Sequence, residues 1–301
     1  MRGILTGISK TAEYIVLATM CLVSSNIAAQ QDITLEDDLR PVWEAGLFTA
    51  VFDTPEYPAA GQNHTNVIAA PYFIYRGETI RIGDGAIARA VAIDKANYEL
   101  DLSLAASFGA NSEDNLARAG MPDIDFIFEL GPQLKMRLRQ FDFVENALAA
   151  HGSGELFLNL QARAVFSTDF SGIDHRGYVF QPMLVYRQRG WLSEKTALSV
   201  SLSPTWATEA LHDYFYQVDT DFVTAQRPAY DAKGGYMGTS LALGFSFDAT
   251  KDIRVFLGAS TTIHDSAANQ NSPLFIEKST YSVGAGLVWR LFASEQRVAG
   301  R

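Results

Sequence analysis

Histidine, serine and acidic side chains are the groups from which a catalytic or metal site would have to be built. The five histidines stand singly along the chain, at His64, His151, His175, His212 and His264. No two have the spacing of a metal-binding motif, so the sequence predicts no metal site. A Ser-His-acid set can be drawn around His175 or His212, but such a triad is defined by its geometry. We therefore expect no catalytic residue, metal or cofactor, and keep a lipid hydrolase as the least favoured alternative.

Five charged side chains form a second candidate site. Glu129, Lys135, Arg137 and Arg139 alternate with apolar residues in one segment, and Arg163 does so in another. We expect all five to point into a narrow polar interior, where opposite charges pair and form an internal plug. An open, ion-selective lining is the alternative.

Strands must position these side chains, and period-two alternation runs through the whole chain. In NYELDLSLAASF, residues 97–108, the apolar side chains from Tyr98 to Phe108 fall on one face, and Glu99, Asp101 and Ser103 fall on the other. The same pattern or a strand-like composition covers residues 42–52, 67–76, 79–82, 86–93, 125–141, 155–166, 178–188, 197–206, 240–247, 253–263 and 281–289. The sequence therefore predicts an all-β chain of about twelve strands, with ten as the alternative.

The length of the strands favours lipid over a protein core as the environment of the apolar face. Most predicted strands approach the roughly 9–11 residues that cross a bilayer at a tilt. Aromatic residues gather near the strand ends, where an interfacial girdle would place them, and long connections alternate with short ones. We predict a transmembrane antiparallel up-and-down β-barrel, with long loops outside and short turns in the periplasm.

The two ends of the chain differ from this pattern. Residues 1–29 have the basic start, short apolar run and small-residue end of a cleaved signal peptide, and contain the single cysteine, Cys21. We expect a periplasmic segment at 30–41, a barrel at 42–292 and a periplasmic tail at 293–301. Alternation places Trp289 on the lipid-facing side of the last strand and Phe292 off it. The net charge of -10 excludes the basic surface that nucleic-acid binding requires.

Five segments together resemble the MipA/OmpV family, the MltA-interacting proteins of the Gram-negative outer membrane. They are WEAGLFTAVFDTPEYPAAGQNHTNVIAAPYFIYRGE, NSEDNLARAGMPDIDFIFELGPQL, DFSGIDHRGY, AQRPAYDAKGGYMGTSLALGFSFD and SPLFIEKSTYSVGAGLVWRLFASEQRV. The residues that match family-typical loop positions are Asp53, Pro55, Tyr57, Pro58, Arg118, Gly120, Asp169, His175 and Gly177. The two prolines suit a rigid first outer loop. Many relatives carry glycine where Ala59 stands, so the turn at this position is a point of departure.

The resemblance implies an outer-membrane barrel with no known catalytic activity. Some members are described as scaffolds that join a lytic murein transglycosylase to a murein synthase, and others as porin-like channels or surface adhesins. We expect such a scaffold, with membrane lipid as its surroundings, and keep a small-solute channel or an adhesin as the alternatives. For His175, we expect a histidine that packs a turn rather than a catalytic base.

Overall fold

The computed structural model describes residues 39–76, 81–82, 93–95, 97–143 and 152–299. The predicted signal peptide, 1–29, and most of the segment 30–41 lie outside these residues. Within the described ranges, no helix is long and apolar enough to cross a membrane.

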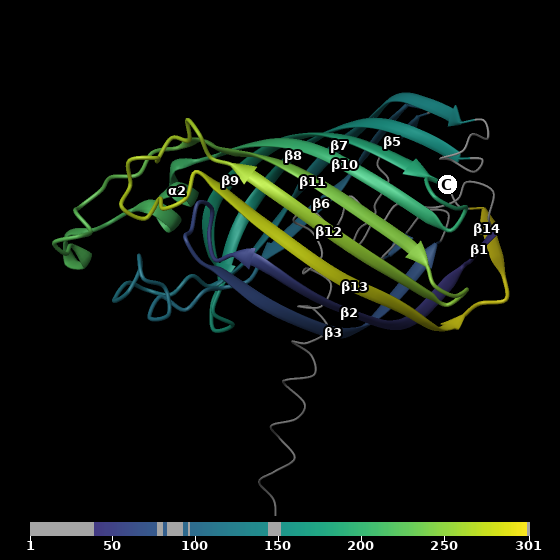
Figure 1. The fold of residues 1–301 in the computed structure, drawn as a ribbon, viewed down its shortest axis with the longest axis horizontal. Helices are drawn as coiled ribbons and strands as arrows, with labels where there is room; N and C mark the ends of the chain where they lie inside the picture. Colours follow the sequence, from purple (N-terminus) through teal and green to yellow (C-terminus); the bar gives the residue numbers. More distant parts are fainter. Residues whose placement is uncertain (1–38, 77–80, 83–92, 96, 144–151, 300–301) are drawn as a thin grey trace, which may run out of the picture.

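Twelve strands form one antiparallel sheet in the order β4-β3-β2-β13-β12-β11-β10-β9-β8-β7-β6-β5 (Figure 1). The long strands are β2 (Trp43–Pro55), β3 (Asn63–Arg76), β6 (Tyr98–Ser107), β7 (Phe126–Phe143), β8 (Gly152–Thr168), β9 (Asp174–Arg189), β10 (Thr196–Ala207), β11 (Gly235–Asp248), β12 (Ile253–Ile263) and β13 (Ser279–Ala293). Two short strands, β4 (Arg81–Ile82) and β5 (Ile93–Lys95), are its edges. Each long strand pairs with its sequence neighbours, and β13 returns to β2, so the predicted antiparallel up-and-down β-barrel architecture is confirmed.

Burial in this sheet is inverted relative to a soluble protein. Ser203 is fully buried and Gln161 is 7% exposed, whereas Leu243 is 53% and Val67 is 76% exposed. On β8 and β10 the buried positions of the alternating pattern are mainly polar, and the apolar positions are the more exposed ones. On β2 and β3 the buried face is apolar instead, with Phe48, Phe52 and Ile68 in one cluster. A continuous apolar surface is unfavourable in contact with water. The outer face is therefore built to contact lipid, and the polar face surrounds a lumen.

Two β-bulges interrupt the alternation near the short-turn ends of the strands. On β7 the register shifts between Arg137 and Arg139, so that Arg139 lies opposite Leu156 on the outer face. This differs from the prediction of a lumen-facing Arg139, because an extra residue in one strand moves every later side chain to the other face. On β13 a shift between Arg290 and Phe292 has the same effect, and Phe292 is 65% exposed rather than turned inward as predicted.

The two rims of the barrel differ in the length of their connections. One rim carries the segments 56–62, 108–125, 169–173, 208–234 and 264–278, which include α2 (Glu209–Tyr216) and η2 (Thr220–Phe222). The other carries short turns and a ribbon of β1 (Leu39–Pro41) paired with β14 (Arg297–Ala299) (Figure 1). Backbone bonds from Val42 N to Gln296 O and from Ser294 N to Trp43 O, both 2.9 Å, continue the β2–β13 ladder into this ribbon. The segment 293–299 is therefore paired with the N-terminal side of the chain.

Candidate functional site

Arg163 organises a polar network on the lumen face of β7, β8 and β9. Its Nε donates to Glu129 Oε2 at 2.6 Å, and its terminal nitrogens donate to Ser103, Gln161 and Gln181. The side chain is only 6% exposed, so the charge is compensated inside the wall of the barrel. Arg163 and Glu129 are thus paired as expected of opposite charges in a narrow interior, since a buried charge of this kind must be paired and hydrogen-bonded. The internal plug itself stays a prediction.

A second group of cations surrounds the ring of Phe157, nearer to the short-turn rim. Lys135 Nζ lies 4.7 Å from the ring centroid and the Arg187 guanidinium carbon lies 5.4 Å from it. Arg137, on the adjacent strand, is 3.6 Å from Glu155 Oε1. Of the five predicted lumen charges, the structure thus brings four to the lumen face, in two separate groups.

The long loops fold inward over the mouth of the lumen. One apolar cluster joins inward-facing strand residues, such as Val165 and Val179, to loop residues such as Leu211, Tyr216 and Leu274. Tyr216 is 1% exposed and Leu274 is fully buried. We call this assembly of the loops 56–62, 108–125, 208–234 and 264–278 the loop cap. Its core residues are as buried as those of a soluble domain, although they lie at the rim of a membrane barrel.

Buried polar groups tie the segments of the loop cap together. Arg118, 4% exposed, donates to Phe215 O at 3.2 Å and to Pro122 O at 3.1 Å, and its guanidinium carbon lies 5.7 Å from the Tyr57 ring centroid. Burial lowers the pKa of Arg118 and raises the pKa of Tyr57 to about 12. The Tyr57 hydroxyl donates to Leu274 O at 2.8 Å, so Arg118 and Tyr57 together join all four loops.

A buried histidine forms a second joint in the loop cap. His212 on α2 is fully buried, and its Nε2 lies 3.1 Å from Gly235 O, which it can only approach as a donor. Its Nδ1 accepts from Asn269 Nδ2 at 2.8 Å, while Asn269 Oδ1 accepts from Lys233 N and the Tyr230 hydroxyl. Burial lowers the pKa of His212, so the ring is held neutral in one tautomer. Both nitrogens are used in packing, which leaves neither for a catalytic triad.

The family-motif residues of the first two loops lie in or beside the loop cap. Asp53 accepts from Asn63 and Thr65 across the end of the β2–β3 hairpin, where Pro55 ends β2. Pro58 O accepts from the Tyr216 hydroxyl at 2.9 Å. Gly120 adopts a φ of 79° in the loop that carries Arg118.

Ala59 also adopts a left-handed φ, 61°. It is fully buried, and its carbonyl accepts from the backbone of both Ile276 and Glu277 at 3.0 Å. These contacts hold alanine in a turn with a strained backbone.

The motif residues at the β8–β9 hairpin do not form a catalytic group. Asp169 accepts from the backbone of Ser171 and Gly172, which lowers the pKa of this exposed carboxyl. The His175 ring packs against Phe166 and Tyr178, with ring centroids 5.4 Å and 5.0 Å away. Gly177 has a φ of 97° where the chain passes Thr208. In the part of the chain described, no three His, Cys, Asp or Glu side chains are grouped so as to hold a metal.

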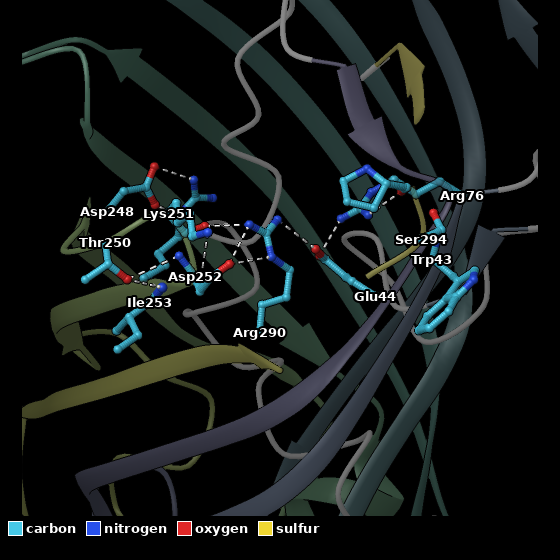
Figure 2. A network of polar contacts seen from close by, with 12 residues as sticks. Trp43, Glu44, Arg76, Asp248, Thr250, Lys251, Asp252, Ile253, Arg290 and Ser294 are labelled. Atoms are coloured by element: carbon cyan, nitrogen blue, oxygen red, sulfur yellow. Dashed lines mark hydrogen bonds and ion pairs between the residues drawn. The ribbon is translucent and has the colours of Figure 1, made fainter. Parts of the chain in front are cut away.

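An ion-pair chain closes the seam between β3, β2, β13 and the β11–β12 turn at the short-turn rim (Figure 2). Glu44 lies between two arginines, 2.7 Å from Arg76 Nη2 and 3.5 Å from Arg290 Nη1. Arg290 also donates to Asp252 Oδ1 at 2.9 Å and to Lys251 O at 2.6 Å. Because these side chains come from four separate elements, no local spacing in the sequence predicts the chain of contacts. The pairs fix this rim and provide a rigid base for the β1–β14 ribbon.

The chain was compared with known protein families, sequences and structures. The model of the family described as MltA-interacting protein MipA matches residues 47–291. No curated protein sequence matches the chain. Similar solved structures include the NanC porin (9% identity, 84% of this chain and 100% of that chain, TM-score 0.33) and an outer membrane channel from Pseudomonas putida F1 (12%, 86% and 100%, 0.37). The CymD monoaromatic hydrocarbon channel is a third (10%, 91% and 99%, 0.33). These similarities are too low to transfer a function. On its family match and its inverted sheet, the chain belongs to the MipA family and is a Gram-negative outer-membrane barrel protein.

Proposed function

We propose that this chain is a non-enzymatic scaffold that holds murein-remodelling enzymes at the periplasmic side of the outer membrane. The observation that carries the proposal is the loop cap, whose buried apolar core rests on inward-facing residues of the barrel mouth. A barrel covered in this way suits docking better than free diffusion of solutes. The family description, MltA-interacting protein MipA, supports a protein partner. From the resemblance described above, we take the partners to be a lytic murein transglycosylase and a murein synthase.

The short-turn rim is the surface we assign to docking. In outer-membrane barrels the short turns face the periplasm, where murein and its enzymes lie. Here that rim combines the Glu44 ion-pair chain with the β1–β14 ribbon, so a partner would meet a fixed surface. Pre-organised surfaces bind at a lower entropic cost than mobile ones.

Capture of murein enzymes on the detergent-solubilised full chain tests the proposal. Periplasmic extract is passed over the immobilised protein, and the retained fraction is assayed for cleavage of murein glycan strands by zymography. We expect retention by the unchanged chain and loss when Arg297–Ala299 are replaced by three glycines. Arg118→Ala, which alters only the loop cap, is the matched control and should retain the activity. Absence of murein-cleaving activity on the unchanged chain would contradict the scaffold role.

A small-solute channel is the second candidate, and the polar lumen favours it. The Phe157 group adds cations to the lumen face, so a channel with this lining would select anions. Planar-bilayer recordings separate the two functions. The scaffold predicts no steady conductance, whereas reproducible anion-selective conductance that falls in Arg137→Gln would replace it with the channel.

A further inference from the structure

A cation stands on the outer face of β7, where the rest of the strand is apolar. The bulge after Arg137 turns Arg139 outward, directly opposite Leu156, and the side chain is exposed. Its guanidinium carbon lies 5.0 Å from the centroid of the Phe141 ring. A charge among lipid chains is costly unless it reaches the headgroup region, so the depth of Arg139 decides what it meets.

That depth follows from the strand. The outward apolar run of β7 extends from Phe126 to Leu138. Twelve residue steps of about 3.4 Å at a tilt of about 40° span about 31 Å, which exceeds the roughly 25 Å height of the apolar band of an outer-membrane barrel. Arg139 is therefore the first outward side chain beyond the band, on the side of the short-turn rim. At this level it meets lipid phosphates rather than acyl chains.

The neighbouring outward positions form a shallow aromatic recess beside it. Phe141 lies opposite Gly154, which lies opposite Gln188 on β9. A Cβ on Gly154 would stand 2.8 Å from the Phe143 ring and 3.1 Å from the Tyr186 hydroxyl. The absence of a side chain at Gly154 therefore leaves the space that these two rings occupy. The Tyr186 hydroxyl contacts Gln188 Oε1 at 3.2 Å.

The polar and apolar parts of this recess are arranged as those of a lipid headgroup site. Leu156, Gly154, Tyr186 and Gln188, the outward residues of β8 and β9 beside Arg139, are all uncharged. The guanidinium is thus the sole charge of this recess among the described residues, and a phosphodiester matches its fork geometry. The aromatic rings suit the interface between headgroups and acyl chains.

We propose that Arg139, Phe141, Phe143, Tyr186 and Gln188 form a binding site for the phosphodiester headgroup of an anionic phospholipid in the leaflet at the short-turn rim. Arg139 donates to the phosphate, Tyr186 and Gln188 provide neutral polar contacts for the headgroup, and the phenylalanine rings contact the start of the acyl chains. The site is independent of the scaffold role and depends only on the outer-membrane fold.

Native mass spectrometry of the detergent-solubilised chain, titrated with phosphatidylglycerol or phosphatidylcholine, tests the site. We expect preferential retention of phosphatidylglycerol, weakened about fivefold in Arg139→Gln, since one cation near a membrane surface contributes about that much. Arg137→Gln is the matched control: it removes the same charge two residues earlier, on the lumen face, and should bind like the unchanged chain. The shift in gel mobility between heated and unheated samples checks that each variant is folded.

Three results would overturn the proposal. The first is equal retention of phosphatidylglycerol by Arg139→Gln and the unchanged chain, which would mean that Arg139 contacts only Phe141 and water. The second is an equal loss in Arg137→Gln, which would indicate a general effect of net charge. The third is displacement of the lipid by millimolar inorganic phosphate, which would assign the cation to free phosphate rather than to a membrane lipid.

Discussion

Arg118→Ala provides the sharpest test of the loop cap. The substitution removes the donor to Phe215 O and Pro122 O and the cation beside the Tyr57 ring. An acceptor that is left buried without a donor costs about 1–3 kcal/mol, and the cation–π contact adds about 1 kcal/mol. The desolvation that lowers the pKa of Arg118 offsets part of this loss. We therefore expect the loop cap to lose about 2–4 kcal/mol, which raises the population of its open state roughly 30-fold to nearly 1,000-fold.

Hydrogen exchange of the protein in lipid vesicles measures this change directly. The amides of Ala110 and Val218, which bond to Ile124 O and Tyr230 O, should exchange faster in proportion to opening, while amides of the long strands keep their rates. Arg254→Ala is the matched control, because Arg254 pairs with Asp248 at the opposite rim. Unchanged exchange in the loop cap of Arg118→Ala, or an equal effect of the control, would refute the assignment of Arg118 as the joint of the loops.

Three further predictions concern the long-loop rim. Ala59→Gly should leave the free energy of unfolding, measured by urea denaturation, nearly unchanged. Relief of the left-handed backbone strain gains about 1 kcal/mol, and loss of the buried methyl group costs about 0.8 kcal/mol. Ala59→Val should clearly lower the free energy of unfolding, because a β-branched residue is more strained at this φ. Gly177→Ala should lower the unfolding free energy by 2 kcal/mol or more, since the new Cβ would stand 2.2 Å from Thr208 Oγ1 at a φ of 97°; an unchanged denaturation midpoint would contradict this. The contribution of neutral His212 should be complete above about pH 6.5 and lost as the pH falls from there towards its lowered folded-state pKa, because protonation of Nδ1 sets two donors against each other at Asn269. Protection factors of the loop-cap amides at pH 7.5 and 5.5, each referred to the intrinsic exchange rate at the same pH, measure this, and equal protection factors would refute it.

Alternation in the sequence was sufficient to predict the sheet and its inversion. Asp101 and Ser103 are buried and Tyr98 is exposed, as the pattern of residues 97–108 requires of a barrel in lipid. The last long strand, β13, ends at Ala293, next to the expected end of the barrel at Phe292. Period two is a local property of neighbouring residues, so a single sequence carries it in full.

The loop cap could not be predicted in this way. α2 lies in a segment that the sequence left as a loop, and Tyr216 and Leu274, two centres of its core, are far apart in the chain. The resemblance did single out Tyr57, Pro58 and Arg118, and the structure brings these three together around Tyr216 and Phe215. Non-local packing leaves no period in the sequence, and here only a family motif pointed to the residues that carry it.

The two bulges explain why alternation placed Arg139 and Phe292 on the lumen side although the structure has them on the outer face. Arg139 and Phe292 follow shifts on β7 and β13, at the same end of two strands on opposite sides of the sheet order. The segments MRLRQF and RLF contain no residue that distinguishes a bulge from a regular strand. A bulge needs only one more residue than the partner strand has, and this count is not visible in either segment alone. Both shifts present an interfacial side chain, a cation in one case and an aromatic ring in the other, at the end of an apolar outward run. The bulges thus set the lower boundary of the lipid-facing band. Deletion of Leu138 should remove the bulge on β7 and leave Arg139 opposite Leu156 on the outer face, because Arg139 would then follow the lumen-facing Arg137 directly in a regular strand.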